Sequence, residues 1–335
     1  MPSTNRYASA HLAPKGPGDA RPTALQIVQD EGLAGKLTGK VVLVTGGSSG
    51  IGIETIRAMT KTGATVFAAA RDLNKAKDAL KGIDGKIELL ELDLASLASV
   101  RAAAADFLKR SNGQLNILIN NAGVMGIPNR TVTVDGFETQ FGTNHLGHFL
   151  LFQLLKSALL SSATPELPSR VIALTSAVHK HSPVLVDDYN LEKEGAYNEF
   201  VAYGHSKTAN IYMANAIERK YGAQGLHGLA VHPGLIATTG LGRHMDPNSW
   251  ENAKIDNPHL EDVLKSPEQG AATSVYAAIG KEFEGVGGKF LEDVGEWDPA
   301  PEGAPPLRTG GWAPWAFDPE MEERVWNDSL KFVGL

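Results

Sequence analysis

Short apolar runs alternate with longer segments of helical spacing along most of the chain. The runs that we predict as strands are VVLVT (41–45), TVFAAA (65–70), KIELLEL (86–92), LNILIN (115–120), RVIALT (170–175), HGLAVH (227–232) and KFL (289–291). A helix candidate follows each run. Regular alternation of this kind is typical of parallel strands joined by crossover helices. We therefore predict an α/β fold with one parallel sheet of about seven strands and helices on both faces.

Irregular segments flank and interrupt this series without dividing it. We therefore predict one domain over residues 37–335, preceded by an arm (1–36) that is rich in proline and glycine and holds one short helix at 24–31. Glycines and prolines break the pattern between residues 235 and 265, which predicts a mobile loop or short helical lid over a pocket. The proline-dense tail, 298–335, is expected to pack back on the body.

Composition narrows the classes of partner. The chain has 335 residues, 42% apolar and 21% charged, which is ample for a large core. Its net charge of −7, without a block of basic residues, disfavours nucleic acid and anionic membranes as partners and leaves small molecules. The absence of cysteine excludes disulfides, thiolate nucleophiles and Cys-based zinc sites. No signal peptide and no apolar stretch near the ~20 residues of a membrane span are present, so we expect a cytoplasmic protein.

A glycine cluster joins the first strand to a helix. VVLVTGGSSGIG (41–52) is followed directly by the helical pattern IETIRAMTK. Glycines are needed where such a turn is tight and where backbone approaches a pyrophosphate, whose charge is stabilised by the helix N-terminus. Gly46, Gly50 and Gly52 are the expected contacts. In this strand-to-helix context the pattern predicts a dinucleotide site, with a merely structural turn as the weaker alternative.

The tip of the second strand favours one dinucleotide over the other. AAARD places Arg71 there, about 20 residues beyond the last glycine of the cluster. Arginine offers a charge-assisted fork to a 2′-phosphate, whereas an acidic residue would accept hydrogen bonds from a ribose 2′-hydroxyl. We therefore expect NADP(H), with NAD(H) less favoured but left open because Asp72 follows immediately.

A tyrosine and a lysine lie four residues apart in a helical segment. The run YGHSK (203–207) precedes TANIYMANAIERKYG, which carries apolar residues at helical spacing. Residues i and i+4 share one face of a helix, so Tyr203 and Lys207 should point the same way. Taken alone, an exposed pair on an amphipathic helix is the commoner explanation, and the other motifs must decide.

Together the motifs resemble those of the short-chain dehydrogenase/reductase family over about residues 37–333. They occur in the family's order as TGGSSGIG, LDL (92–94), NNAG (120–123), Asn144, Ser176, YGHSK and HPG (232–234). TNHLGHFLLFQLL and the block from Thr175 to Asn210 look most like the branch of retinol dehydrogenases and WW-domain oxidoreductases, and like related fungal proteins. The resemblance implies a Rossmann-type doubly wound sheet and an oxidoreductase.

The resemblance implies four catalytic residues. Tyr203 would give or take the proton of the substrate oxygen, Ser176 would donate a hydrogen bond to that oxygen, and Lys207 would hold the nicotinamide ribose. A free phenol needs a pKa shift of about three units, roughly 4 kcal/mol, to ionise at neutral pH, and we expect the Lys207 ammonium, helped by the charge of the cofactor, to supply it. Asn144, in a predicted helix over 133–155, would hold a water near Lys207, although a structural role for its amide stays open.

The resemblance also implies the residues that bind the cofactor. Asp93 would contact the adenine amino group, and Ile236 and Thr238 would bind the nicotinamide carboxamide. The whole expected set is Gly46, Ser48, Ser49, Gly50, Ile51, Gly52, Arg71, Asp93, Leu94, Asn121, Ala122, Gly123, Tyr203, Lys207, Pro233, Gly234, Ile236 and Thr238.

Histidines beside the expected site do not predict a metal. His145, His148, His179 and His181 lack the supporting carboxylates and spacing of a metal site, so we expect none there. Of the four, His179 is the one placed to touch substrate.

The predicted function is reduction of a ketone or aldehyde, or oxidation of the corresponding alcohol, with NADP(H). An NADP(H)-binding regulator without turnover and a dehydratase or epimerase on the same scaffold are the alternatives. Apolar residues of the lid suggest an apolar substrate; they are Leu235, Leu241, Met245 and Trp250. Both a homodimer and a monomer stay open.

Overall fold

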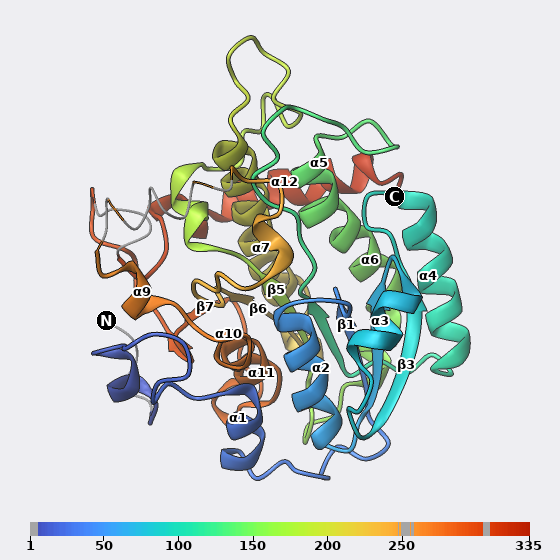
Figure 1. Ribbon diagram of the computed structural model, residues 1–335. Helices are drawn as coiled ribbons and strands as arrows, with labels where there is room; N and C mark the ends of the chain where they lie inside the picture. Colours follow the sequence, from blue (N-terminus) through green and yellow to red (C-terminus); the bar gives the residue numbers. More distant parts are fainter. Residues whose placement is uncertain (1–5, 247, 249–254, 256–257, 304–308) are drawn as a thin grey trace.

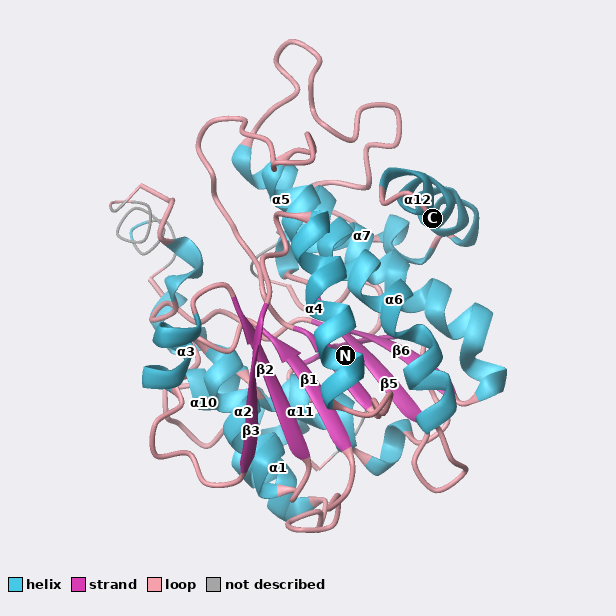
Figure 2. Ribbon diagram, turned by 90° about the vertical axis from the view of Figure 1, so that its right-hand side faces the viewer, coloured by secondary structure: helices cyan, strands magenta, loops and turns pink. Residues whose placement is uncertain are grey.

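One central sheet lies between two layers of helices in the computed structural model, which describes residues 6–246, 248, 255, 258–303 and 309–335 (Figure 1, Figure 2). The strands are β1 (Val41–Thr45), β2 (Thr65–Ala70), β3 (Lys86–Glu91), β4 (Ile117–Asn120), β5 (Ser169–Leu174), β6 (Leu226–Val231), β7 (Lys289–Glu292) and β8 (Gly295–Glu296). Their order is β3-β2-β1-β4-β5-β6-β7-β8, and all neighbours are parallel except β7 and β8. The α/β doubly wound fold is confirmed.

The strand order reverses between β1 and β4. In sheets of this topology a crevice opens at that point, outside the carboxyl ends of the strands. Central strands such as β1, β5 and β6 are buried along their whole length, as expected where helices cover both faces. Edge strand β3 instead alternates more and less exposed positions.

Two groups of helices cover the two faces (Figure 2). One face carries α1 (Ala24–Asp30), α2 (Ile51–Lys61), α10 (Pro267–Gly270) and α11 (Ala272–Ile279), and the other carries α4 (Leu97–Arg110), α6 (Gly147–Ser162), α7 (Glu199–Tyr221) and α12 (Pro319–Phe332). The shorter helices are α3 (Leu73–Ala79), α5 (Thr139–Phe141) and α9 (Leu260–Val263). Single 3₁₀ turns lie at Ala8–His11, Ala177–His181, Gly222–Gln224, Gly240–Gly242, Lys281–Phe283 and Pro314–Phe317.

Two local expectations were wrong. Strand β8 was not predicted, because it is a two-residue return strand that follows a turn at Asp293 and Val294, both with positive φ. The helix predicted from residue 133 begins only at α5, because Gly136 (φ +86°) turns the chain there. The carboxylate of Glu138 caps α5 by accepting hydrogen bonds from Gln140 N and Phe141 N.

Helix α7 packs closely on strand β6 of the sheet. Its N-terminus is capped by Asn198, whose side chain accepts hydrogen bonds from Phe200 N and Val201 N. Near its middle, Gly228 of β6 faces Ala214, and a Cβ at Gly228 would lie 2.2 Å from Ala214 O. The glycine in β6 therefore allows α7 to lie close to the sheet. This close packing determines how deeply the side chains of α7 are buried.

The C-terminal tail packs on the body, as predicted. Trp312 Nε1 donates to Trp297 O (2.9 Å), and Trp315 Nε1 donates to His179 O (3.2 Å). Helix α12 then lies along α7. In the part of the chain that the structure describes, no helix is both long and apolar enough to cross a membrane.

We expect Gly228→Ala to lower the free energy of unfolding by about 1–3 kcal/mol, because the added methyl group overpacks the contact between α7 and β6. Urea unfolding monitored by tryptophan fluorescence measures the change. Gly240→Ala is the matched control, since a Cβ there meets nothing within 4 Å and its φ is not in the left-handed region. Equal stability of the two variants would contradict the packing argument.

Candidate active site

The motifs of the sequence gather at the carboxyl ends of the parallel strands. The glycine turn follows β1, the NNAG turn follows β4, Ser176 follows β5 and the HPG turn follows β6. Because these strands are parallel neighbours, their ends meet at one edge of the sheet. Helix α7 passes beside this edge and carries Tyr203 and Lys207.

Tyr203, Lys207 and Ser176 lie together. The amine Nζ of Lys207 is 5.5 Å from the centre of the Tyr203 ring, so the pair shares a face of α7 as predicted. The same amine donates a hydrogen bond to Leu174 O at the end of β5 (3.0 Å). The Ser176 side chain lies near enough to the Tyr203 phenol to lower its pKa, and Ser176 Oγ accepts a hydrogen bond from Val178 N (3.2 Å). Tyr203 and Lys207 are each only 3% exposed.

Burial sets the protonation of this pair. Desolvation raises the pKa of Tyr203 well above its usual value, and the hydrogen bond with Ser176 lowers it only in part. Desolvation also lowers the pKa of Lys207 to about 7. In the protein alone, Lys207 does not offset this desolvation of the phenol, because the amine is itself desolvated and is only partly charged near neutral pH. The acidification expected from Lys207 together with the charge of the cofactor stays a prediction.

Asn144 lies in a π-helical turn, Gly142–Leu146, between α5 and α6. Wide turns of this kind occur often at functional sites. Its side-chain Nδ2 donates to Val124 O (2.9 Å) and Ser206 Oγ (3.0 Å), and its Oδ1 accepts from Val124 N (2.8 Å). Asn144 therefore ties the loop after β4 to α7. The water that the resemblance implies stays a prediction.

The glycine turn has the shape of a cradle for a pyrophosphate. A Cβ at Gly52 would lie 2.2 Å from Gly46 O, and one at Gly46 would lie 2.9 Å from Asn121 Nδ2. Gly46 and Gly50 have φ of +80° and +60°, which favours glycine. Helix α2 begins at Ile51, directly after the turn, and points its N-terminus at the cradle. These residues fit a dinucleotide, and Ser48 and Ser49 lie in the same turn.

Polar atoms near the NNAG turn also fit a ligand or water. Asn121 Nδ2 donates to Thr45 O (2.8 Å), and Ala122 N donates to Thr45 Oγ1 (3.0 Å). Among the described residues, nothing hydrogen bonds to Asn121 Oδ1 or to either side-chain atom of Asn120, although all three atoms are buried. Buried polar atoms are seldom left without a partner. A Cβ at Gly123 would lie 3.5 Å from Lys207 Nζ, so this turn reaches the pair of Tyr203 and Lys207.

Arg71 is exposed at the end of β2. The carboxylate of Asp72 is engaged elsewhere, because it caps α3 by accepting a hydrogen bond from Lys75 N (2.9 Å). Burial and then the charge of Arg71 lower the pKa of Arg243 in the lid, and burial, Arg243 and Arg71 lower the pKa of His244. Arg243 and His244 were not among the predicted contacts, because nothing in the sequence of the lid relates them to β2.

The start of the lid lies over the glycine turn. A Cβ at Gly50 would lie 3.1 Å from Thr239 Cγ2, and one at Gly126, after β4, would lie 2.5 Å from Met245 Cγ. Ile236 is half-buried and Thr238 is exposed in the segment between Gly234 and Thr239. Trp250 lies outside the described residues.

Four further expected contacts follow strands β3 and β6. Asp93 follows β3, and its Oδ1 accepts a hydrogen bond from Ala95 N (3.0 Å), which leaves the second oxygen for the adenine contact that the resemblance implies. Leu94 is buried against Gly147 at the start of α6, where a Cβ on the glycine would meet Leu94 O at 2.5 Å. Pro233 and Gly234 follow β6 and are half-buried.

His179 does not face a substrate, contrary to expectation. It is fully buried, its Nδ1 lies 2.6 Å from Ser176 O, and its Nε2 accepts a hydrogen bond from Ala313 N (3.0 Å). His179 therefore holds the loop after β5 to the tail. His148 bridges Asn144 O and Thr45 Oγ1, each at 2.9 Å. Over the ranges the structure describes, no three His, Asp or Glu side chains gather as a metal site.

Comparisons with known proteins agree with this arrangement. The sequence model of a family described as short chain dehydrogenase matches residues 40–249. Penicillium roqueforti short-chain dehydrogenase/reductase prx1 is 51% identical over 98% of this chain and 95% of its own length. Human retinol dehydrogenase 13 is 38% identical over 89% of this chain and 86% of its own. A solved Pseudomonas aeruginosa RhlG/NADP complex is similar with a TM-score of 0.61 and 28% identity, over 76% of this chain and 94% of that one.

The lowered pKa of Lys207 predicts a pH-dependent stability. Between about 7 and the unfolded value of 10.5, the unfolded chain binds the additional proton, so raising the pH favours the folded state. Relative to Lys207→Met, the free energy of unfolding should rise by up to about 1.4 kcal/mol per pH unit in this window and stay level below it. Urea unfolding of both proteins across this pH range measures the difference. Identical pH profiles would contradict the assignment.

Proposed function

The chain belongs to the short-chain dehydrogenase family, and on that premise we propose that it is an NADP(H)-dependent oxidoreductase that reduces an apolar ketone or aldehyde. The observation that carries the proposal is the meeting of Tyr203, Ser176 and Lys207 beside the NNAG turn. The sequence motifs of the chain predicted that it belongs to this family. The fungal and retinol dehydrogenase relatives of the chain are those of the predicted branch.

Tyr203 serves as the proton donor to the carbonyl oxygen. Its raised pKa keeps the phenol protonated at neutral pH, and this is the form that a donor requires. The Ser176 hydroxyl donates a hydrogen bond to the same oxygen and stabilises the negative charge that develops there. NADPH, when bound, supplies the hydride. The direction of turnover is set by the cofactor pool of the cell, so with NADPH we expect reduction.

Lys207 has two roles in the proposed site, one toward the phenol of Tyr203 and one toward the ribose of the cofactor. Its amine, held by Leu174 O, lies close enough to the ring to stabilise the phenolate left after proton transfer. With a pKa of about 7 the amine gains a proton readily beside a phosphate-bearing cofactor, and the ammonium can donate to ribose hydroxyls. Asn144 and Ser206 fix the backbone around this pair.

The preference for NADP(H) rests on the charges at the end of β2. Arg71 offers a guanidinium for the 2′-phosphate, and Asp72 is engaged in capping α3. Arg243 adds a second guanidinium from the lid on the same side, and the neighbouring His244 has its pKa lowered by burial, Arg243 and Arg71. A ribose with a free 2′-hydroxyl would gain little from two guanidinium groups.

The lid supports an apolar substrate. Met245 packs on Gly126 after β4, and Leu235 and Leu241 are half-buried in the same segment. Human retinol dehydrogenase 13 is named for an apolar alcohol. We therefore propose aldehydes and ketones of apolar molecules as the substrate class.

Tyr203→Phe should lower turnover by at least about a hundredfold, because the phenyl ring has no proton to donate. Affinity for NADPH should stay near the wild-type value. A screen of apolar aldehydes and ketones, monitored by NADPH absorbance, measures turnover, and fluorescence titration measures affinity.

Tyr212→Phe is the matched control on the same helix, since the Tyr212 hydroxyl bonds to Trp315 O in the tail. Near-normal turnover in Tyr203→Phe would overturn the proposed mechanism. If the wild-type protein binds NADPH but reduces no carbonyl in the screen, the alternative of a regulator without turnover is favoured.

Arg71→Ala should raise the KM for NADPH by about tenfold or more while changing the KM for NADH little, because only NADPH carries the 2′-phosphate. Lys75→Ala, on the exposed side of α3, is the matched control for loss of one positive charge. Equal changes for the two cofactors would remove the assignment of Arg71.

A further inference from the structure

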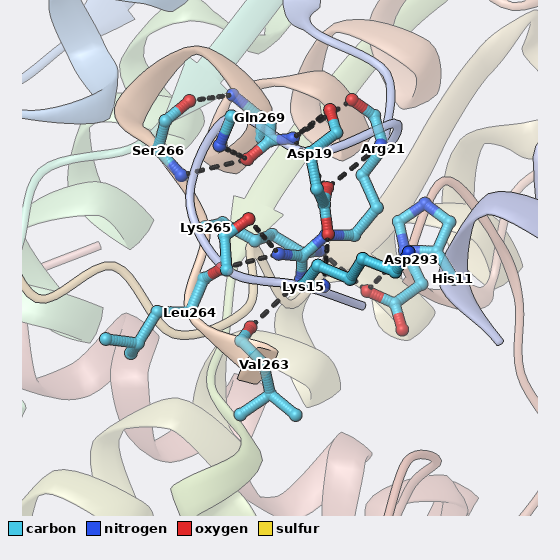
Figure 3. Close-up of polar contacts among 12 residues, drawn as sticks. His11, Lys15, Asp19, Arg21, Val263, Leu264, Lys265, Ser266, Gln269 and Asp293 are labelled. Carbon is cyan, nitrogen blue, oxygen red and sulfur yellow. Dashed lines mark hydrogen bonds and ion pairs between the residues drawn. The ribbon is translucent and has the colours of Figure 1, made fainter. Parts of the chain in front are cut away.

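The N-terminal arm contacts the end of the lid. Residues 15–21, which we call the arm loop, lie against the segment from Asp262 to Gln269 (Figure 3). Gly16 N donates to Asp262 O (2.8 Å), so the two backbones touch directly. The arm loop is thus part of the surroundings of the lid, although it is far from it in the sequence.

A buried arginine makes most of this contact. Arg21 is 4% exposed and donates to Val263 O (3.0 Å) and Leu264 O (2.5 Å). It also donates to Gly16 O (3.0 Å), and its Nε pairs with Asp19 (2.8 Å). A buried charge is costly unless it is paired and hydrogen bonded. The arm loop supplies the pairing carboxylate of Asp19, and the lid end supplies the carbonyl acceptors of Val263 and Leu264.

A buried glutamine fastens the other side of the arm loop. Gln269 Oε1 accepts hydrogen bonds from Gly18 N (3.0 Å) and Ser266 N (3.1 Å). Its Nε2 donates to Asp19 O (3.2 Å), Asp19 Oδ1 (3.0 Å) and Arg21 O (3.1 Å). Gln269 also completes the capping box of α10, so the arm loop and this helix start share one set of hydrogen bonds.

The end of the lid is hydrogen bonded to its beginning. Lys265 N donates to Leu235 O (2.8 Å), which joins the two ends of the lid. A Cβ at Gly270 would lie 2.7 Å from Ile236 Cγ1 and 2.9 Å from Ile51 Cγ2. Gly270, the last residue of α10, therefore packs against both Ile236 and Ile51, the first residue of α2.

A second anchor lies beside the HPG turn. Lys265 Nζ pairs with Asp293 after β7 (2.6 Å) and donates to Pro233 O (3.4 Å). His11 of the arm pairs with the same carboxylate (3.2 Å). A Cβ at Gly234 would lie 2.8 Å from Lys265 Cε, so the lysine stem lies directly on the HPG turn.

We propose that Arg21 is a positioning residue for the nicotinamide half of the cofactor. By fixing Val263 and Leu264, the arm loop fixes Lys265, and through Leu235 it fixes the segment 235–238 at the place where Ile236 and Thr238 would meet the nicotinamide. Arg21 does not touch the cofactor. The proposal rests on the proposed function, because it concerns the same dinucleotide site.

The test compares two ligands on Arg21→Met, which keeps the length of the side chain and removes its donors. NADPH spans the whole site, whereas 2′-phospho-ADP-ribose carries the same adenosine half without nicotinamide. The Kd for NADPH should rise by about tenfold, within the range of coupling between linked sites. The Kd for 2′-phospho-ADP-ribose should stay unchanged. Calorimetric titration measures both, and thermal unfolding of the free proteins is recorded alongside.

Arg6→Met is the matched control in the arm, because Arg6 pairs with Glu31 and bonds to Asp30 O at the end of α1. It should change neither affinity. Asp19→Asn is the second variant, in case Arg21→Met does not fold, and it should weaken NADPH binding in the same selective way.

Three outcomes would overturn the inference. Equal loss of affinity for both ligands would show that the arm loop supports the fold as a whole, and unchanged affinity for both would show that it does not act on the site. Selective loss for 2′-phospho-ADP-ribose would place its effect at the adenosine half. If the wild-type protein bound neither compound, the proposed function itself would fail, which the variants alone would not cause.

Discussion

A pair of hydrogen bonds fastens helix α7 to the end of strand β5, and the geometry of the site depends on them. Lys207 Nζ donates to Leu174 O, and Thr175 Oγ1 donates to Lys207 O (2.9 Å). Tyr203 lies one turn earlier on the helix and Ser176 lies two residues after Leu174. The position of the phenol relative to the serine hydroxyl therefore depends on these two side chain-to-backbone hydrogen bonds. Close packing of α7 on β6 at Gly228 maintains the same depth further along.

The burial of Tyr203 and Lys207 also determines their protonation states. The phenol and the amine are both removed from water, and each is pushed toward its neutral form. A neutral phenol beside a partly neutral amine is a low-charge arrangement that a buried site tolerates well. Anionic phosphates nearby would shift this balance toward the ammonium, so cofactor binding and the charge on Lys207 are linked.

Strands and motifs were predictable because they are local. Apolar runs such as VVLVT report burial on both faces, and the glycine turn follows from the backbone angles it needs. The direction of the Tyr203 pKa was not predictable, because it depends on desolvation by residues that are distant in the sequence. Neither was the engagement of His179, whose partner is Ala313 in the tail. Arg243 and Arg21 carry no local signal, since each acts on a segment that only the fold brings near.

The wide turn around Asn144 sets an angular offset that ordinary helix would not give. Each residue of an α-helix advances by about 100° around the helix axis. The additional residue in the π turn Gly142–Leu146 therefore rotates the residues before the turn, about that axis, relative to the residues after it. Shortening Gly142–Leu146 by a single residue would let the ladder close with normal spacing and swing the Asn144 amide away from Val124 and Ser206. The length of this segment is therefore constrained more tightly than its composition, and insertions or deletions here would be tolerated less well than substitutions.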